Sequence, residues 1–213
     1  GMAGEGVLRQ CLVHDQVEQI LVVGRRNCGI SHPKIQEIIL TDFMNPEILE
    51  EKIKDFDACF FCLGVSSVGM KEAQYTTLTH TLTLRFARTL SKNNPQMTFC
   101  YISGAATDST EKGRIMWARV KGRTENDLKK LPFKAVYNFR PGYMQPDKGS
   151  RNTLVYYKFV RWMYPLFKLL FPGFVSRLSD LGRAMIQVCI HGYTKTEIEV
   201  KDIKLLSSNL KSE

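Results

Sequence analysis

A hydroxyl and an amine with the spacing of a catalytic site lie near the middle of the chain. Residues 96–102 are rich in β-branched and aromatic types over the length of one strand, and Ser103 follows them directly. A helical pattern resumes at Gly113 and contains Trp117 and Lys121, which are four residues apart and therefore share one helix face. Open α/β sheets place their chemistry where strands end, so this segment is the first candidate site.

The elements around this segment must position it, and their pattern predicts the fold class. We expect strands at residues 19–23, 35–40, 58–63, 96–102, 133–139 and 197–200, with helices at 5–13, 45–54, 70–92 and after Gly113. Apolar strands that alternate with helices indicate a parallel sheet covered on both faces. The prediction is a Rossmann-like, doubly wound α/β domain over residues 1–149, with residues 150–213 as a small helical C-terminal cap in the same structural unit.

Composition narrows the class of function. With 44% hydrophobic and 24% charged residues, the chain has the makeup of a globular protein. The 30 basic and 21 acidic residues give a net charge of +9, which suits an anionic cofactor or a membrane surface. The basic residues form no block longer than two, so we expect no nucleic-acid partner. The six cysteines follow no secreted disulfide pattern and predict buried thiols in a reducing compartment, with no metal site.

Seven short motifs occur in an order that resembles a known family. They are Gly1-x-x-Gly4-x-Gly6, Gly24-Arg25-Arg26, Phe61-Cys-Leu-Gly64, Ile102-Ser-Gly-Ala105, Val120-Lys-Gly122, Arg140-Pro-Gly142 and Asp180-Leu-Gly-Arg-Ala-Met185. Together they resemble the atypical, extended short-chain dehydrogenase/reductases. Within that family the chain is similar to the NAD(P)H-binding epimerase/dehydratase-like branch that includes Tat-interacting-protein homologues. The likeness covers essentially the whole chain.

The resemblance implies a pyrophosphate site at Gly1, Gly4 and Gly6, because glycines between a strand and a helix permit close backbone approach. A plain helix-capping turn is the alternative. Family members place a strand and one more glycine before this turn, and neither precedes Gly1 here. We therefore expect a gap between the strands at 19–23 and 58–63, or a substitute strand from a partner chain or the C-terminal region.

The resemblance also implies which nucleotide binds. Family members carry an acidic residue for the NAD ribose, or a basic one for the NADP phosphate, where this chain has Arg25 and Arg26. Guanidinium groups suit a phosphate better than a diol, so NADP is expected over NAD, with a solvated basic pair as the alternative. The other implied cofactor contacts are Asp42 (alternatively a turn residue), Leu63, Gly64, Lys121, Pro141 and Gly142.

In the family's chemistry a tyrosine is the general acid/base, a lysine lowers its pKa and holds the nicotinamide ribose, and a serine polarises the substrate oxygen. Ser103 and Lys121 match two of these positions, and Trp117 replaces the tyrosine. An indole N–H does not titrate in a useful range, so Trp117 cannot supply the proton. Tyr143, Tyr101 or water are the alternative donors. Ser103 as a turn residue and Lys121 on a solvated helix face also stay open.

Two functions follow from this resemblance. The first is an NADP-dependent oxidoreductase of weak or specialised activity on a small carbonyl or sugar-nucleotide substrate. The second is a non-catalytic nucleotide-binding regulator or scaffold that kept the pocket and lost the acid. We expect a cytoplasmic protein in either case, since no signal peptide or spanning apolar run is visible.

Residues 152–171 combine basic residues on one helical face with aromatic and apolar residues elsewhere. This composition is typical of an interfacial membrane helix. It equally suits a helix that caps the substrate pocket or packs against a second subunit of a homodimer. The sequence predicts peripheral membrane contact or a subunit interface here, or a pocket cap.

Overall fold

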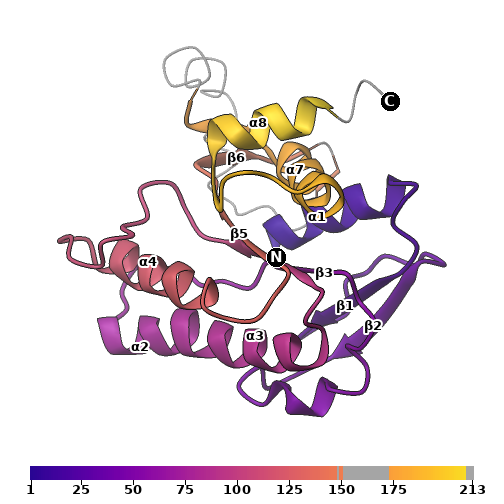
Figure 1. Ribbon diagram of the computed structural model, residues 1–213, viewed down its shortest axis with the longest axis horizontal. Helices are drawn as coiled ribbons and strands as arrows, with labels where there is room; N and C mark the ends of the chain where they lie inside the picture. The colour runs from indigo at the N-terminus through magenta and orange to yellow at the C-terminus, as the bar shows by residue number, and fades with distance from the viewer. Residues whose placement is uncertain (148, 151–172, 210–213) are drawn as a thin grey trace.

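The computed structural model describes residues 1–147, 149–150 and 173–209 (Figure 1). The expected membrane or subunit contact at 152–171 lies outside the described residues. The described helices are α1 (Met2–Val13), α2 (Glu72–Thr76), α3 (Leu82–Asn93), α4 (Met116–Leu128), α7 (Leu178–His191) and α8 (Val200–Asn209). The described strands are β1 (Ile20–Gly24), β2 (Ile35–Ile39), β3 (Ala58–Phe61), β4 (Thr98–Ile102), β5 (Ala135–Arg140), β6 (Tyr143–Gln145), β7 (Val175–Arg177) and β8 (Glu197–Glu199).

Every described strand pair is parallel, which confirms the predicted Rossmann-like class. The largest sheet has the order β3-β4-β5-β8, β1 pairs with β2, and β6 pairs with β7. In a parallel sheet all strands end at one edge, so the loops after β3, β4 and β5 meet there. That edge carries the candidate site.

Helices cover both faces of the sheet, as Figure 1 shows. On one face α3 buries Leu82, Phe86 and Leu90 at four-residue spacing against Phe99 and other apolar side chains of the strands. On the other face α1, α7 and α8 pack over Cys100, Tyr137, Phe139 and Ile198. The C-terminal segment thus forms part of the core, because β8 extends the main sheet and α7 covers it.

Two expected helices differ in detail from the prediction. The expected helix at 45–54 is only a 3₁₀ turn, η1 (Pro46–Leu49), because Asn45 directs its amide to Asp42 instead of capping a longer helix. The expected helix at 70–92 is continuous, but its middle is a π-helical segment, η2 (Thr77–Thr81), between α2 and α3. The first helix begins at Met2, so Gly4 and Gly6 lie inside it.

The expected gap in the sheet is present among the described strands. Among the described strands, β1 pairs only with β2, and β3 pairs only with β4. One edge of β1 and one edge of β3 therefore have no described partner strand, and the missing strand would lie between them. The C-terminal strand β8 pairs with β5 at the opposite edge and does not fill the gap.

A strand supplied to this gap should stabilise the fold. We expect that fusing a five-residue β-branched segment ahead of Gly1 raises the melting temperature by several degrees. The reason is that each added backbone hydrogen bond contributes roughly 0.5–1.5 kcal/mol. Differential scanning calorimetry measures the shift. A segment of equal length rich in Ser, Asp and Pro is the control, and equal melting temperatures for the two fusions would contradict the expectation.

Candidate functional site

Backbone pairing continues past the ends of β4 and β5 and builds the floor of the site. The Ser103 amide donates to the Phe139 carbonyl at 2.7 Å, and the Ala105 amide donates to the Pro141 carbonyl at 2.9 Å. These bonds keep the two loops side by side after the strands end. The Ser103 motif and the Pro141–Gly142 turn, predicted separately from the sequence, therefore lie together.

Lys121 reaches from α4 to the end of β4. Its Nζ donates to the Ile102 carbonyl at 3.1 Å and to the Ser103 carbonyl at 3.0 Å, and it lies 5.4 Å from the centroid of the Tyr101 ring. The solvated-face alternative for Lys121 is thus wrong. An ammonium has three donors, so one remains after the two carbonyls are satisfied.

Burial also changes the pKa of this amine. It lowers the pKa of Lys121 to about 8, and the nearby carboxylate of Glu125 limits the fall. Lys121 is therefore mostly charged at pH 7 and loses its proton as the pH rises through about 8. An ammonium at this place can donate to a hydroxyl or stabilise a negative oxygen.

Ser103 is buried, and its hydroxyl lies 2.9 Å from the hydroxyl of Thr107. Thr107 Oγ1 also donates to the Gly104 carbonyl, which folds the loop back on itself. Ser103 thus has a turn role, and its hydroxyl is oriented by a neighbour that the sequence did not single out. Ser103 and Lys121 are brought together.

Trp117 lies over the backbone of the same loop. A Cβ built on Gly104 would be 3.7 Å from the indole Cζ3, so the ring packs against the site as a wall. Of the alternative proton donors, Tyr101 is almost fully buried, and burial raises its pKa far above the ordinary value. Tyr101 is unsuited to acid/base work near neutral pH. The Tyr143 hydroxyl donates to Gln145 Oε1 at 3.0 Å.

Of the three N-terminal glycines, Gly1 begins α1, and Gly4 and Gly6 let this helix pack closely on its neighbours. Gly1 is the N-cap of α1, and a Cβ there would meet nothing within 4 Å. A Cβ on Gly4 would lie 3.4 Å from Cys62, and one on Gly6 would lie 2.8 Å from Leu178. The small residues let α1 approach β3 and α7 closely. Its first turn then points to open space at the strand ends.

The remaining predicted cofactor residues follow other strands. Arg25 and Arg26 are exposed directly after β1. Asp42 accepts the Met44 amide at 2.8 Å and the Asn45 side chain, which fits the turn alternative. After β3, Leu63 packs on the core, whereas Gly64 is exposed with open space at its Cα.

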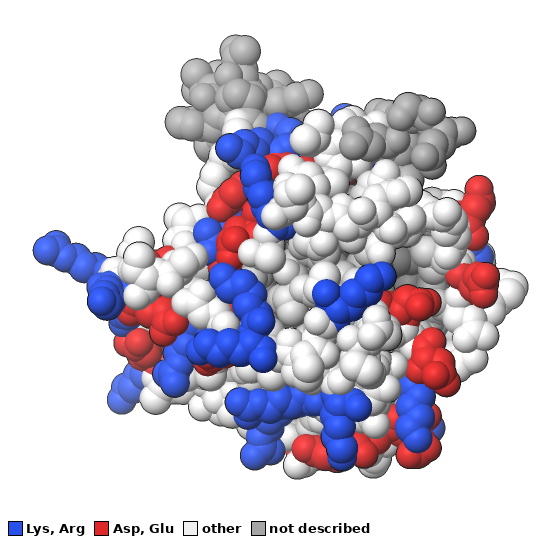
Figure 2. Space-filling view, viewed as in Figure 1, with Lys and Arg blue, Asp and Glu red and all other residues white. Residues whose placement is uncertain are grey.

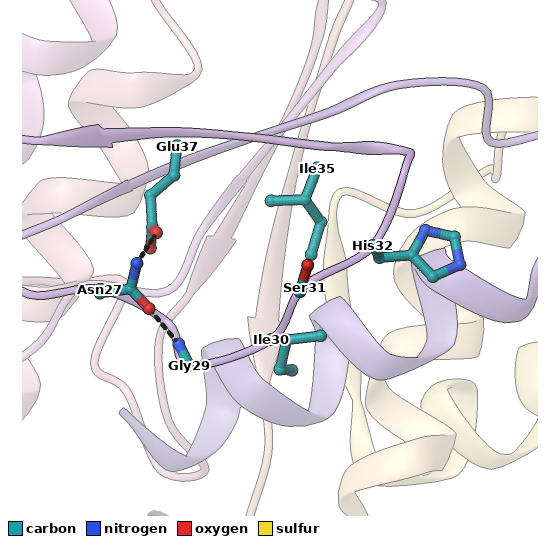
Figure 3. A pocket seen from close by; sticks show the side chains of 7 residues that line it. All are labelled: Asn27, Gly29, Ile30, Ser31, His32, Ile35 and Glu37. Carbon is teal, nitrogen blue, oxygen red and sulfur yellow. Dashed lines mark hydrogen bonds between the residues drawn. The ribbon is translucent and has the colours of Figure 1, made fainter.

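A shallow cavity of about 340 Å³ lies in the loop between β1 and β2, next in sequence to Arg26 (Figure 3). Glu37 lines it and accepts hydrogen bonds from the Asn27 amide and the Cys28 backbone at 2.5 Å. These bonds fix the loop that follows the two arginines. The loop leaves an open, polar hollow lined also by Ser31 and His32.

An ion pair that the sequence did not reveal lies beneath the site. Glu125 is completely buried on α4 and accepts two hydrogen bonds from Arg140 at the end of β5, at 3.0 and 2.5 Å. Its position four residues after Lys121 was the available signal.

The described residues contain no group of three or more His, Cys, Asp or Glu side chains that could hold a metal ion. The six cysteines are free thiols, of which Cys11 and Cys100 are buried as predicted and the other four are only partly buried. The sulfur atoms of Cys100 and Cys189 lie 3.8 Å apart, and burial raises the pKa of Cys11 to about 12. These features point to a core of unreactive thiols.

Known proteins are similar to this chain in fold. No family model matches. Protein FMP52-2, mitochondrial, from Scheffersomyces stipitis is 28% identical over 157 residues, which are 72% of this chain and 67% of that protein. Among solved structures, the Bordetella bronchiseptica enzyme WbmG in complex with NAD has a TM-score of 0.65 at 12% identity. The match covers 100% of this chain and 76% of the other.

Two further structures have the same fold. UDP-glucose 4-epimerase from Thermotoga maritima, with UDP-glucose, has a TM-score of 0.64 at 14% identity. The match covers 98% of this chain and 79% of the epimerase chain. DesIV, a dTDP-glucose 4,6-dehydratase from Streptomyces venezuelae with NAD and TYD bound, has a TM-score of 0.65 at 13% identity. That match covers 100% of this chain and 79% of the other. At such identities the likeness establishes the Rossmann-like fold.

No helix among the described residues is long and apolar enough to cross a membrane. Figure 2 shows Lys and Arg side chains over the left, central and lower parts of one face, with Asp and Glu side chains among them and along the right edge. A basic surface attracts anionic ligands through long-range electrostatics.

Removal of the Lys121 amine should change how stability depends on pH. The pKa of Lys121 is lower in the folded chain than in the unfolded one, so the unfolded state binds more protons between about pH 8 and 10.5. The wild-type unfolding free energy should thus rise by about 1–2 kcal/mol relative to Lys121→Met between pH 7 and 9.5. Urea titrations measure this difference. Lys134→Met removes an exposed lysine as the control, and identical pH profiles for wild type and Lys121→Met would refute the buried charge.

Proposed function

We propose that the chain is a NADP(H)-binding protein of the short-chain dehydrogenase/reductase type, with slow or specialised oxidoreductase activity. The observation that carries this proposal is the Lys121 ammonium fixed on the Ile102 and Ser103 carbonyls at the carboxyl ends of a parallel sheet. Ligands of such sheets bind at this edge. Solved structures of the same fold that contain NAD or UDP-glucose support the choice of ligand class.

The residues fit a dinucleotide at four points. The first turn of α1 offers backbone N–H groups and open space at Gly1 for a pyrophosphate. The exposed pair Arg25–Arg26 after β1 suits a ribose phosphate. The remaining donor of Lys121 suits a ribose hydroxyl, and Gly64 leaves room for the second ribose beside β3.

The bound nucleotide would supply or accept a hydride, and the protein's own groups would act on the substrate oxygen. Ser103 would polarise the carbonyl by turning its hydroxyl hydrogen, which otherwise points to Thr107 Oγ1, toward the substrate oxygen. Trp117 would form an apolar wall of the pocket and contribute no proton. The substrate in this proposal is a small carbonyl compound or a sugar nucleotide. The expected cytoplasmic location remains a prediction, and the mitochondrial relative offers an alternative compartment.

The arginine pair provides the test of cofactor choice. We expect the full chain to bind NADPH more tightly than NADH. In Arg25→Ala/Arg26→Ala, NADPH affinity should fall by roughly 10–100-fold and NADH affinity should change little, because charge-assisted hydrogen bonds to the extra phosphate are lost. Isothermal titration calorimetry measures both nucleotides. Arg123→Ala removes an exposed guanidinium on α4 as the control, and equal loss for both nucleotides would exclude a phosphate clamp.

A second candidate, a non-catalytic nucleotide-binding regulator, is favoured by Trp117 alone. We expect Trp117→Tyr to raise NADPH oxidation on a panel of aldehydes, ketones and UDP-glucose by up to about 10²–10⁴-fold, because a positioned acid is restored. Trp117→Phe is the matched control that changes the ring without adding a hydroxyl. Activity that rises from nothing with tyrosine identifies the parent as a binding protein. A parent that is already active, and unchanged by tyrosine, uses another proton donor, and Tyr143→Phe then becomes the informative variant.

A further inference from the structure

The Glu125–Arg140 ion pair is buried more deeply than a surface salt bridge. The Glu125 side chain has no exposed surface, and the Arg140 side chain is 11% exposed. Arg140 donates Nε to one carboxylate oxygen at 3.0 Å and Nη2 to the other at 2.5 Å, a two-point contact that fixes the plane of both groups. Arg140 also donates to Ser109 and, at 3.3 Å, to Glu199. The carboxylate is held rigidly under α4.

Both partners adjoin residues of the proposed nucleotide site. Glu125 lies one helical turn after Lys121, so the two side chains share the inward face of α4. Arg140 ends β5 and directly precedes Pro141, whose carbonyl accepts the Ala105 amide. The pair therefore ties the helix that carries Lys121 to the strand end that forms the floor of the site.

The groups around the Lys121 ammonium come from four elements. From α4, Glu125 supplies a negative charge. From β4, the Tyr101 ring lies under the amine, and Tyr75 of α2 is its buried neighbour. Burial raises the pKa of both tyrosines, so they stay neutral near pH 8. From β5, Arg140 is positive, but its charge is directed to Glu125 and Glu199.

We propose that Glu125, fixed by Arg140, is the positioning residue that keeps Lys121 charged where the Ile102 and Ser103 carbonyls hold it at the end of β4. The proposal rests on the proposed function in that Lys121 is taken to hold the nucleotide. Desolvation alone would favour a neutral amine here, and the carboxylate opposes it through charge. Arg140 prevents the carboxylate from turning toward Lys121 and forming a closed pair that would occupy the amine.

The direct test is the titration of Lys121 itself, which needs no nucleotide. In protein labelled with ¹³C-lysine, the Cε resonance of Lys121 is assigned by its absence in Lys121→Met. We expect a wild-type midpoint near 8 and a midpoint lower by about one pH unit or more in Glu125→Gln. Glu199→Gln removes the other carboxylate on Arg140 as the matched control and should leave the midpoint near the wild-type value. An unchanged midpoint in Glu125→Gln would overturn the proposal.

Nucleotide affinity gives the second readout. If the charged amine binds NADPH, a midpoint near 7 weakens binding about fivefold at pH 8 and hardly at all at pH 6. A purely structural role for Glu125 would weaken binding equally at every pH, and that result would overturn the proposal. A wild-type chain that binds no dinucleotide refutes the proposed function, whereas the lysine titration still decides the role of Glu125.

Glu125→Gln leaves Arg140 buried without its partner and is expected to be less stable. The double variant Glu125→Gln/Arg140→Gln removes both charges, with an isosteric change at Glu125 and a shorter neutral side chain at Arg140. Its Lys121 midpoint should lie between those of Glu125→Gln and wild type, because the lost positive charge partly offsets the lost negative one. If only the double variant folds, a midpoint below wild type supports the proposal and an unchanged midpoint contradicts it.

Discussion

The parallel pairing of β4 with β5 is the constraint on which the site depends. The pairing continues beyond both strands through the Ser103–Phe139 and Ala105–Pro141 hydrogen bonds, so two loops distant in sequence stay in register. Lys121 then connects α4 to this pair of strands by donating to two carbonyls at the end of β4. Without this register, Ser103, Lys121 and the turn after β5 would share only a sheet edge and not a site.

The site combines a placed amine and hydroxyl with a wall that carries no acid/base group. The amine and hydroxyl are placed and oriented, and the wall is an indole that cannot exchange a proton in a useful range. Tyr101 is too deeply buried to replace it. This combination favours binding over rapid turnover. It also explains why the charge state of Lys121 matters, because the amine is the group near the site with a pKa of about 8.

The sequence predicted the fold well because its strands are short and apolar and most of them alternate with helical segments. It placed β1, β2, β4 and β5 within a few residues, as well as the gap beside β3. It overestimated the helix at 45–54, since local propensity at Pro46 did not reveal the competing Asn45–Asp42 contact. Within the site, the motifs located Ser103 and Lys121. The Thr107 contact and the Arg140–Glu125 pair depend on how loops and strands meet in space, and no local pattern encodes that.

The central claim is that a dinucleotide binds at the carboxyl edge of the sheet. A ¹⁵N-HSQC titration of the full chain with NADPH tests it most directly, because it reports where the ligand lies even when turnover is absent. The account predicts that the perturbed amides cluster at the ends of β1, β3, β4 and β5, at Arg25–Arg26, Gly64, Ser103–Gly104 and Gly142. Perturbations confined to other surfaces, such as the β1–β2 cavity around Ser31 and His32, or no perturbation at millimolar NADPH, would contradict it.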